Sequence, residues 1–398
     1  MTLLESIRQR SVDIAATTVA HRRHLHAHPE LSYQEIKTAS FVAEQLRTIG
    51  IEPLTGVGGT GVTAMIHGTG GESNRVTALR ADMDALPIHE ANNVSYQSTV
   101  PGVMHACGHD VHTASLLGTA RLLQEHRAQF SGTVKLIFQP GEEKNPGGAS
   151  YMIRDGALQN PAPTSIIGQH VMPLLPVGTI GFREGKYMAS SDEIYLRVIG
   201  KGGHAAAPEL TIDPVVIAAH IVIALQQVIS RNASPKEPTV LSFGRFIADG
   251  ITNIIPSEVT LAGTFRALNE EWRANGLKKI ETLARQMAAS MGAVCEVEIS
   301  RGYPYLENNP ALTRRIKKAA QAYVGERHVV DIDLTLGSED FAYYSHVVPA
   351  SFYRLGTRNE AKGITSYVHT PTFDIDEEAL QIAPGLMAWM AIEELMQP

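Results

Sequence analysis

The sequence has only two cysteines, Cys107 and Cys295, among its 398 residues. Two thiols are far too few for the disulfide framework on which small secreted proteins rely, and they fit a reducing compartment. The N-terminal segment is interrupted by Glu5 and Arg8, so it lacks the apolar core of a signal peptide. We therefore expect a cytoplasmic protein.

Long runs of a single residue class are also missing. Basic residues occur at most in pairs and the net charge is −7, so the electrostatic footprint of a nucleic-acid-binding protein is absent. No apolar run approaches the ~20 residues that cross a bilayer, and we expect no membrane association. No repeat of solenoid period and no low-complexity tract is present. A small molecule is therefore the expected partner.

The sequence does have enough apolar material for two domains. Hydrophobic residues make up 44% and charged residues 19% of the chain, which is ordinary for a globular protein. A single hydrophobic core stops growing near roughly 250–300 residues. A chain of 398 residues is therefore expected to divide.

The first and last parts of the chain alternate between helix and strand patterns. Apolar residues at helical spacing predict helices over 3–26, 36–49, 111–126, 310–324 and 377–396. Enrichment in β-branched residues between turn residues predicts strands over 61–66, 76–82, 133–139 and 165–169. Such alternation is typical of an α/β sheet with helices on both faces, in which sites form at the carboxyl ends of the strands.

The middle of the chain follows a different order. Its predicted elements are a strand at 193–199, a helix at 214–230, strands at 239–246 and 258–267, a helix at 270–291 and a strand at 293–300. This β-α-β-β-α-β order is that of a ferredoxin-like domain. We therefore predict one discontinuous domain, from residues 1–187 and 301–398, with a second domain inserted at residues 188–300.

The segment from His105 to Asp110, HACGHD, is the most informative in the chain. In an extended segment, Cys107 and His109 share one face, and a thiolate and an imidazole are both ligands of transition metals. A lone cysteine is more often a buried apolar residue. His109, two residues later, favours the interpretation of Cys107 as a metal ligand.

A pair of glutamates, Glu142 and Glu143, follows a predicted strand in the segment QPGEE. Two adjacent carboxylates could equally form a solvated turn. Pro140 and Gly141, however, build a tight loop from the strand end that fixes both side chains. One carboxylate can then bind a metal ion while the other accepts a proton from water.

Two further histidines, His170 and His369, extend the set of candidate ligands. Each alone could be a core or loop histidine. Together with Cys107, His109 and Glu143 they make five ligands, too many for one catalytic zinc ion with an open position but suitable for two ions. The sequence thus predicts a hydrolytic, dinuclear metal centre. The four histidines near the first helix, His21, His24, His26 and His28, are interpreted as solvated or capping groups.

Three residues of the inserted domain are further candidates. His204 follows two glycines, but Lys-Ser/Thr is missing after them, so the loop is not a phosphate-binding P-loop. His204 is either a surface histidine or a group that polarises a carbonyl oxygen. Structural pairing is the default interpretation of Asn253 and Arg266, although an arginine fork binds carboxylates well.

Taken together, the motifs resemble those of the hippuricase-like amidohydrolases. This branch of the aminoacylase and carboxypeptidase superfamily of dinuclear metallohydrolases includes the plant auxin-conjugate hydrolases. The matching segments occur in order over nearly the whole chain: RRHLHAHPELSYQE from Arg22, ALRADMDALPI from Ala78, HACGHDVHTA from His105, FQPGEE from Phe138, GQHVMP from Gly168, GKGGHAAAPE from Gly200, NIIPSEVTLAGTFRA from Asn253, GSEDFAYY from Gly337 and VHTPTFDIDEEAL from Val368.

The resemblance implies a mixed-sheet α/β catalytic domain with an inserted ferredoxin-like satellite domain, through which the chain would form a homodimer or higher homo-oligomer. It implies two divalent ions per subunit, Zn, Mn, Ni or Co. Their ligands would be Cys107, His109, Glu143, His170 and His369.

The resemblance also implies roles for five residues around this centre. Glu142 would be the catalytic base, and Asp84 a carboxylate that orients a ligand, as such partners do in metal sites. In the satellite domain, His204 would contact the scissile carbonyl oxygen, in some relatives across a dimer. Asn253 and Arg266 would contact the carboxylate of the substrate.

The expected reaction is hydrolysis of the amide bond of an N-acyl amino acid, such as hippurate or an N-acetyl amino acid, to a carboxylic acid and a free amino acid. A carboxypeptidase or dipeptidase is the alternative, since the same centre cuts either amide. A binding protein without catalysis is a third possibility. Gln169, Met172 and Ala207 depart from residues frequent in the family, so the acyl-group preference stays open.

Overall fold

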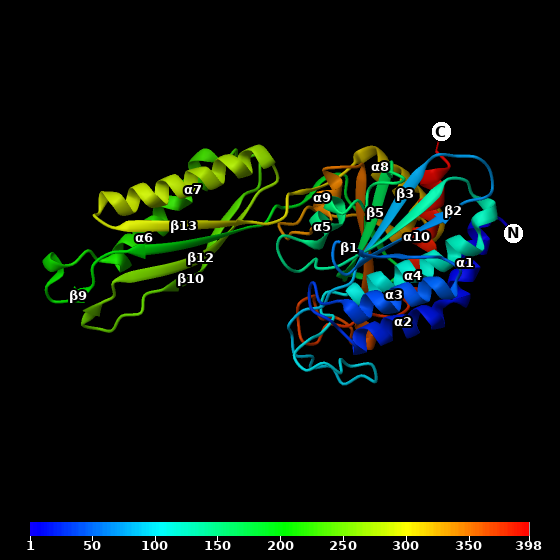
Figure 1. Cartoon of the computed structure of the whole chain (residues 1–398), viewed down its shortest axis with the longest axis horizontal. Helices are drawn as coiled ribbons and strands as arrows, with labels where there is room; N and C mark the ends of the chain where they lie inside the picture. Colours follow the sequence, from blue (N-terminus) through cyan, green and yellow to red (C-terminus); the bar gives the residue numbers. More distant parts are fainter. Residues whose placement is uncertain (398) are drawn as a thin grey trace. The chain divides into compact units, whose positions relative to one another are not determined.

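The computed structural model describes residues 1–397, which divide into two compact units (Figure 1). Unit 1 consists of Met1–Tyr187, Glu307–Leu334 and Asp340–Pro398, and unit 2 of Met188–Leu306 and Thr335–Glu339. Unit 1 has a mixed α/β sheet and unit 2 a smaller antiparallel sheet. The predicted fold class is confirmed.

An eight-stranded mixed sheet forms the middle of unit 1. Its strands lie in the order β1-β2-β4-β3-β5-β16-β6-β15. Their bounds are β1 Leu54–Val57, β2 Gly61–His67, β3 Val76–Asp82, β4 Thr133–Gln139, β5 Ser165–Pro176, β6 Ile180–Phe182, β15 Val329–Asp331 and β16 Ala350–Arg358. The central strands β4, β3, β5 and β16 pair in parallel. Every residue of β3 is buried, because helices or loops cover both faces of the sheet.

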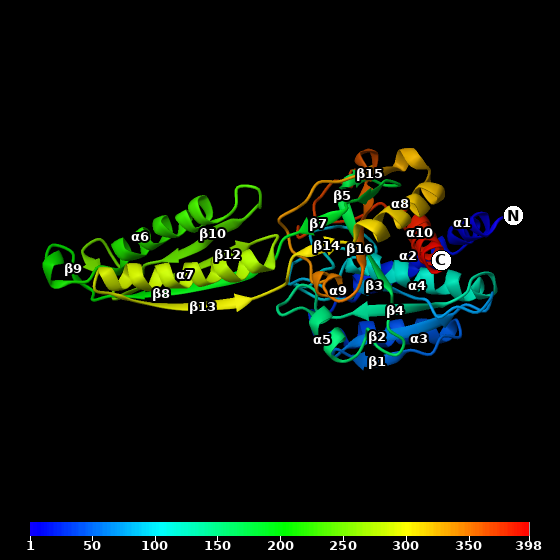
Figure 2. The same cartoon turned by 90° about the horizontal axis from the view of Figure 1, so that it is seen from above.

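Helices α4 and α10 pack against each other and against the central strands of this sheet. Figure 2 shows the short helices α5 and α9 close together, and they contact β4 and β16. The helices of unit 1 are α1 Leu3–Asp13, α2 Ala15–Ala27, α3 Ile36–Thr48, α4 His109–Glu125, α5 Gly148–Arg154, α8 Pro310–Val324, α9 Ala342–Ser345 and α10 Ala379–Leu395. The single helix predicted over 3–26 is two helices, since the chain turns at the buried Ile14.

Strand β16, which the sequence pattern did not predict, lies between β5 and β6 in the middle of the sheet. Phe352, Tyr353 and Leu355 are buried, and the first two have high β-propensity, but Arg354 interrupts the apolar run. Pairing with β16 also extends β5 beyond its predicted end at 169. His170 therefore lies inside a strand and not just after one.

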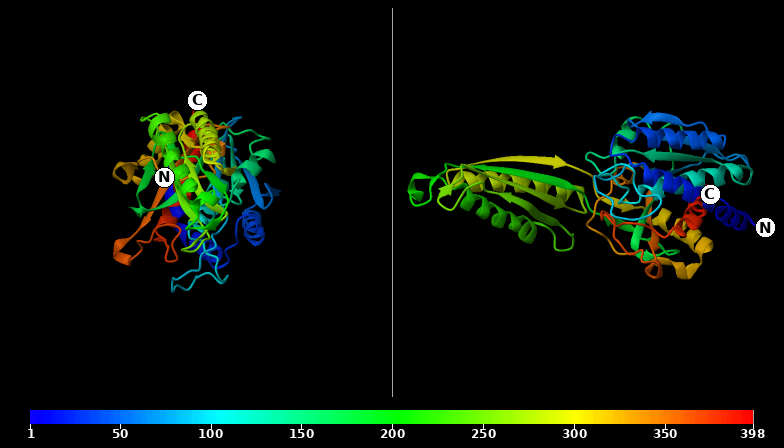
Figure 3. Two further views of the ribbon diagram at one scale, coloured as in Figure 1. Left: turned by 90° about the vertical axis from the view of Figure 1, so that its left-hand side faces the viewer. Right: turned by 90° about the horizontal axis from the view of Figure 1, so that it is seen from below.

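Unit 2 has a four-stranded antiparallel sheet in the order β10-β12-β8-β13, with helices α6 and α7 on one face (Figure 3). The element order is β8 Asp192–Ile199, α6 Pro214–Gln227, β10 Val240–Ile247, β12 Glu258–Arg266, α7 Glu270–Ser290 and β13 Val294–Arg301. This is the predicted ferredoxin-like order. Two short strands, β9 Gly203–His204 and β11 Ile254–Ile255, form a separate pair.

Helix α6 and the turn that follows it, Pro214–Asn232, are long and apolar enough to span a membrane by length and composition, with a mean hydropathy of 1.5. The expectation that no segment reaches this level is wrong for this stretch, because its apolar residues continue past His220. One face of the helix, including Ile217 and Ile221, lies in the core of unit 2. Val216 and Ile223, on its outer face, are 51% and 72% exposed.

Candidate metal centre

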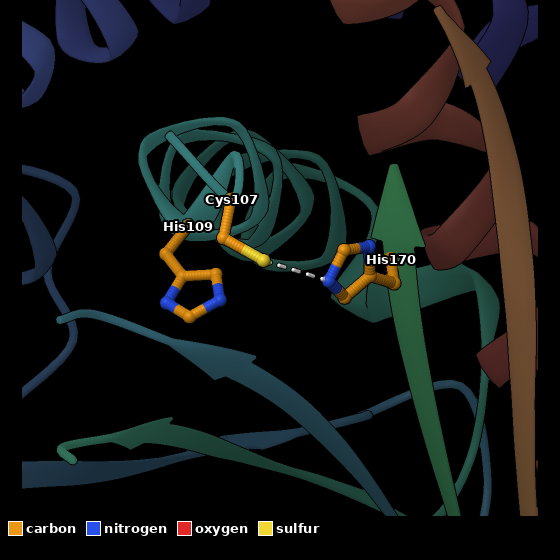
Figure 4. Close-up of side chains that lie close together, drawn as sticks. All are labelled: Cys107, His109 and His170. Carbon is orange, nitrogen blue, oxygen red and sulfur yellow. Dashed lines mark hydrogen bonds between the residues drawn. The ribbon is translucent and has the colours of Figure 1, made fainter. Parts of the chain in front are cut away.

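Cys107, His109 and His170 converge where α4 begins and where β5 leaves the core of unit 1 (Figure 4). Cys107 Sγ lies 3.3 Å from His170 Nε2. Gly108, between the two ligand candidates of the motif, has a φ of +84° and precedes the first turn of α4. A Cβ atom at this position would lie 2.6 Å from the side chain of Val171, so only glycine fits the turn.

Glu143 and His369 complete the cluster from two other loops. His369 Nε2 lies 3.3 Å from Cys107 Sγ and 3.2 Å from Glu143 Oε1. The His369 backbone has a φ of +61°, and its N–H donates to the Ala106 carbonyl at 2.8 Å. The structure thus brings the five predicted ligands together as two groups that share Cys107: Cys107 with His109 and His170, and Cys107 with Glu143 and His369.

The donor atoms of this cluster fit transition metal ions. His109 Nδ1 donates to the Asp84 carbonyl at 2.8 Å, and within residues 1–397 the buried Nε2 of the same ring has no hydrogen-bond partner. His170 Nδ1 donates to the Val171 carbonyl at 2.7 Å, which leaves Nε2 facing Cys107. Buried polar atoms without partners are uncommon. One thiol, three imidazoles and one carboxylate suit two transition metal ions better than magnesium or calcium.

Asp84 joins His109 to the loop that carries the glutamates. Its two carboxylate oxygens accept the backbone N–H groups of Glu142 at 3.0 Å and of Glu143 at 2.9 Å. The Ser32 hydroxyl donates to Asp84 at 2.6 Å. Burial opposes ionisation of Asp84, but its hydrogen bonds, above all with His109, lower its pKa. This anion therefore fixes the ring of one ligand candidate and the backbone of the next.

Glu35, which the sequence analysis did not single out, holds the same loop from its other side. Its carboxylate accepts the N–H of Gly141 at 2.8 Å, the N–H of Tyr33 at 2.8 Å and the hydroxyl of Thr60 at 2.7 Å. Burial raises the pKa of Glu35. The only signal for this residue in the sequence was its place at the end of the motif RRHLHAHPELSYQE.

The Glu142 carboxylate lies beside the cluster, within one group with His109 and Glu143. The side chain is buried, and the Asp340 N–H lies 3.4 Å from its Oε1. Because Asp84 holds both backbone N–H groups, the two glutamate side chains start from fixed positions. The arrangement suits one carboxylate to metal binding and its neighbour to proton transfer.

Asp82 and His112 form a second pair that the sequence analysis gave no role. Asp82 Oδ1 lies 2.6 Å from His112 Nδ1, and Arg80 Nη1 donates to Asp82 Oδ2 at 2.6 Å. Asp82 Oδ2 also lies 3.7 Å from His109 Nε2. Although Asp82 is buried, the surrounding His109, Arg80 and His112 hold its pKa well below the usual range. A further negative charge is thus fixed behind the ligand cluster.

In the metal-free chain, the carboxylates around the cluster stabilise the protonated forms of two ligand candidates, His109 and Cys107. Burial acts against a charged His109, but Asp82, Asp84 and Glu143 raise its pKa to about 10. Burial and the nearby Glu143 raise the pKa of Cys107 well above its usual value. Metal ions must displace both protons to bind here.

His26 is buried, and the interpretation of this residue as a solvated or capping group is wrong. Its Nδ1 lies 2.8 Å from Asp110 Oδ2 and its Nε2 lies 3.2 Å from Glu90 Oε1. Arg22 donates to the same Asp110 oxygen at 2.8 Å. A charged network between α2 and α4 therefore replaces the predicted solvent contact.

The three candidates of the inserted domain lie in unit 2, at two separate places. His204 is exposed in β9. The N–H of Ala205, the residue after His204, donates to the Asn253 carbonyl at 3.0 Å, so His204 and Asn253 lie at the same place. Arg266 is the last residue of β12 and donates to the Ser338 hydroxyl at 2.8 Å. The strand between the two places spans about 27 Å at roughly 3.4 Å per residue. Within unit 2, Arg266 is therefore remote from His204 and Asn253.

The chain is similar in sequence to a known family and to several known hydrolases. Residues 78–392 match the profile of "Peptidase family M20/M25/M40". N-acetylcysteine deacetylase of Bacillus subtilis (strain 168) is 40% identical, over 93% of this chain and 95% of the relative. IAA-amino acid hydrolase ILR1-like 4 of Arabidopsis thaliana is 38% identical, over 95% and 86%. Thermostable carboxypeptidase 2 of Saccharolobus solfataricus is 38% identical, over 99% of both chains.

The fold is similar to that of solved structures. The crystal structure of the Bacillus subtilis YXEP protein, described as a dinuclear metal binding peptidase from the M20 family, superimposes with a TM-score of 0.83. It is 36% identical in sequence, and the match covers 97% of this chain and 99% of that one. The relatives span the same length and both units.

Proposed function

The chain belongs to peptidase family M20/M25/M40, whose members hydrolyse amide or peptide bonds, and we propose that it releases free amino acids from N-acyl amino acids. The observation that carries this proposal is the pair Glu142 and Glu143, which Asp84 holds side by side at a cluster of five metal-ligand candidates. A carboxylate next to a metal ligand is what amide hydrolysis by activated water requires.

The proposed cofactor is a pair of divalent ions, Zn, Mn, Ni or Co. One ion would be held by each of the two groups that share the Cys107 thiolate, and the ligand groups match the description of the YXEP relative as dinuclear. When bound, such ions lower the pKa of water toward neutrality and polarise a carbonyl oxygen.

The residues of this chain then move the protons of the reaction. Glu142 would accept a proton from the attacking water and return it to the amide nitrogen, which leaves as the amine of the amino acid. Asp84 would keep this carboxylate in place through the backbone of the loop. His204 would donate to the carbonyl oxygen, and Asn253 and Arg266 would bind the α-carboxylate.

The similarity to two relatives supports the proposal that this chain acts on amides with a free carboxylate at the amino-acid end. The named activities of the deacetylase and the IAA-amino acid hydrolase release an acyl group from an amino acid. Carboxypeptidase or dipeptidase activity is the second candidate, favoured by the similarity to thermostable carboxypeptidase 2. A binding protein without catalysis is disfavoured, since Glu142 and all five ligand candidates are present.

The experiment that tests the reaction combines a substrate panel with a change of the base. The metal-stripped protein would be reconstituted with each of the four ions and assayed on hippurate, N-acetyl amino acids and dipeptides. We expect hydrolysis of the N-acyl compounds and little activity on dipeptides, whose charged amine distinguishes the two classes. Preference for dipeptides would favour the peptidase alternative.

In the same assay, Glu142→Gln should keep both ions and lose about 10²–10⁴-fold in turnover, because the base is removed while the ligands stay. Glu125→Gln is the matched control, since Glu125 lies at the other end of α4 and pairs with Arg10. A Glu142→Gln variant with full activity would contradict the assignment of the base.

A homodimer is the proposed assembly. Strand β12, which leads from the end near Asn253 to Arg266, is roughly 27 Å long, which is too far for one N-acyl amino acid to reach His204, Asn253 and Arg266 of the same unit 2. We propose that the partner protomer supplies His204 and Asn253 and pairs through unit 2. The exposed edge strand β10, where Phe246 and Ile247 are 44% and 42% exposed, and the apolar outer face of α6 support this interface.

Mixing two inactive variants tests this arrangement. A mixed dimer of a Glu142→Gln chain and a His204→Ala chain would contain one site with an intact Glu142 and the intact His204 of the other protomer. We expect activity to return when the two proteins are mixed and allowed to exchange subunits. If each chain used its own His204, every site would carry a defect and the mixture would stay inactive.

We also propose a cytoplasmic location for the protein. In that compartment both free cysteines would stay reduced.

A further inference from the structure

His112, one turn after His109 on α4, is a fully buried histidine that contacts two other elements. Its Nδ1 lies 2.6 Å from Asp82 Oδ1 at the end of β3. Its Nε2 accepts the backbone N–H of Val171 in β5 at 2.9 Å. Both ring nitrogens are thus used, one toward a side chain and one toward the backbone of the strand that carries His170.

The tautomer of His112 follows from these two partners. A backbone N–H can only donate, so Nε2 carries no hydrogen and the ring proton is on Nδ1. Nδ1 therefore donates to Asp82, whose other oxygen accepts from Arg80 Nη1 at 2.6 Å. The ion pair with the buried Arg80 keeps Asp82 an acceptor.

Val171 connects His112 to His170 through two backbone hydrogen bonds. The Val171 N–H is held by His112, and the Val171 carbonyl accepts from His170 Nδ1 at 2.7 Å. His170 Nδ1 therefore carries the ring proton, and the unprotonated Nε2 faces Cys107 Sγ at 3.3 Å. The rings of His112 and His170 lie close together, with centroids 4.8 Å apart.

We propose that His112 is a positioning residue for the metal-ligand candidate His170, and that Asp82 selects the tautomer of His112 that this role requires. The chain of contacts runs from Arg80 through Asp82, His112 and Val171 to His170. It fixes the backbone beside His170 and directs Nε2 toward Cys107, where Cys107, His109 and His170 could together hold an ion. Partners of this kind orient ligands and raise metal affinity.

This inference rests on the proposed metal site but not on the proposed substrate. The measured quantity is therefore ion binding by the whole chain, with Co²⁺ as the probe. Stoichiometry and affinity come from titration of the metal-stripped protein, and the thiolate-to-cobalt absorption band reports the environment of Cys107. If the protein binds two ions but hydrolyses no N-acyl amino acid, the proposed function fails while this test still decides the role of His112.

Three variants of His112 and one control separate positioning from simple packing. His112→Phe keeps the ring and removes both hydrogen bonds. His112→Gln retains an acceptor that reaches the Val171 N–H, whereas His112→Asn is too short to reach it but can still donate to Asp82. His126→Phe is the control, because His126 is also buried and lies just after α4, at the far end from the cluster.

We expect His112→Phe and His112→Asn to bind one of the two ions about 10- to 100-fold more weakly, with an altered absorption band. His112→Gln should stay near the unchanged protein, and His126→Phe should bind both ions normally. Unchanged affinity and spectrum in folded His112→Phe would overturn the proposal. If His112→Phe does not fold, the other two variants decide: equal affinities in His112→Gln and His112→Asn would overturn it.

Discussion

Asp84 accepts the backbone N–H of Glu143 at 2.9 Å through one carboxylate oxygen, while its other oxygen accepts the N–H of Glu142 at 3.0 Å. The same side chain lies 3.2 Å from His109 Nδ1. One anion therefore sets the position of three chemically important residues. The role predicted for Asp84 concerned the orientation of a ligand alone.

Replacement of Asp84 by asparagine should affect both metal binding and turnover. One oxygen becomes an amide donor that faces a backbone N–H, so the loop loses one of its two anchors. We expect a loss of about 10- to 100-fold in metal affinity and a larger loss of activity. Metal content by mass spectrometry and initial rates measure these effects. Ser32→Ala, which removes only the hydroxyl that donates to Asp84, is the control and should change both quantities far less.

Substitution of Gly108 tests the packing between the start of α4 and β5. In Gly108→Ala the new Cβ would lie 2.6 Å from the Val171 side chain, at a φ of +84°. We expect a loss of about 1–3 kcal/mol in the free energy of unfolding, measured in urea. Gly102→Ala is the matched control, since Gly102 has a φ of +76° and no atom within 4 Å of the new Cβ. Equal losses in both variants would show that backbone strain, and not the clash, dominates.

The His26 network should make stability depend on pH. Burial and Arg22 lower the pKa of His26, but Asp110 and Glu90 more than offset them and raise it above the ordinary 6.5. A raised pKa means that protonated His26 stabilises the folded state below pH 6.5, and that this stabilisation is lost as the pH rises through the folded value.

Urea unfolding of the metal-free protein between pH 5.5 and pH 9 checks this sign. The difference in unfolding free energy between the unchanged protein and His26→Gln should be largest at the acidic end and shrink toward the alkaline end. A difference that grows with rising pH would show that His26 is neutral in the folded state.

Metal binding should release protons. The pKa of His109 is raised to about 10 and that of Cys107 lies well above its usual value, so both hold protons near neutral pH. We expect the apparent affinity for Zn²⁺ to rise between pH 6 and pH 9 as competition from protons falls. Calorimetric titration in two buffers of different ionisation enthalpy measures the protons released. Binding heats that do not depend on the buffer would contradict this expectation.

The chemistry of Cys107 should make the enzyme sensitive to oxidation. Its Sγ lies 3.3 Å from the Nε2 atoms of both His170 and His369, so loss of the thiolate would affect both groups of ligand candidates. Hydrogen peroxide should remove activity, because a sulfenic or sulfinic acid at Cys107 would bind divalent ions less well than the thiolate. Cys107→Ala should bind fewer ions and lose most activity. Cys295→Ala, at the buried thiol of unit 2, should behave like the unchanged protein.

Much of the site could be predicted from the sequence because its residues occur in short motifs. Cys107 and His109 lie two residues apart, and Glu142 and Glu143 are adjacent after a strand. Local chemistry at such spacing points to a metal ligand set without knowledge of the fold. His369 is ambiguous by itself and became a ligand candidate only as a member of this set, since nothing in its own loop indicates a ligand.

The supporting contacts could not be predicted, because they join residues that are remote in the sequence. Glu35 binds the N–H of Gly141, and His112 binds the N–H of Val171. A backbone N–H has no signature in a sequence, so neither contact has a local pattern. Strand β16 was missed for a different reason, since Arg354 interrupts its short apolar stretch from Phe352 to Leu355.

The order of the ligands along the chain has a consequence for synthesis. Cys107, His109, Glu143 and His170 precede the segment that forms unit 2, whereas His369 follows it. At about 5–20 residues per second, the roughly 200 residues between His170 and His369 take about 10–40 s to be made. During that interval the nascent chain carries Cys107 and three other ligand candidates without His369, which completes the second group. Under metal-poor conditions we therefore expect the Cys107 thiol to stay without its full set of neighbouring ligand candidates until His369 has been made.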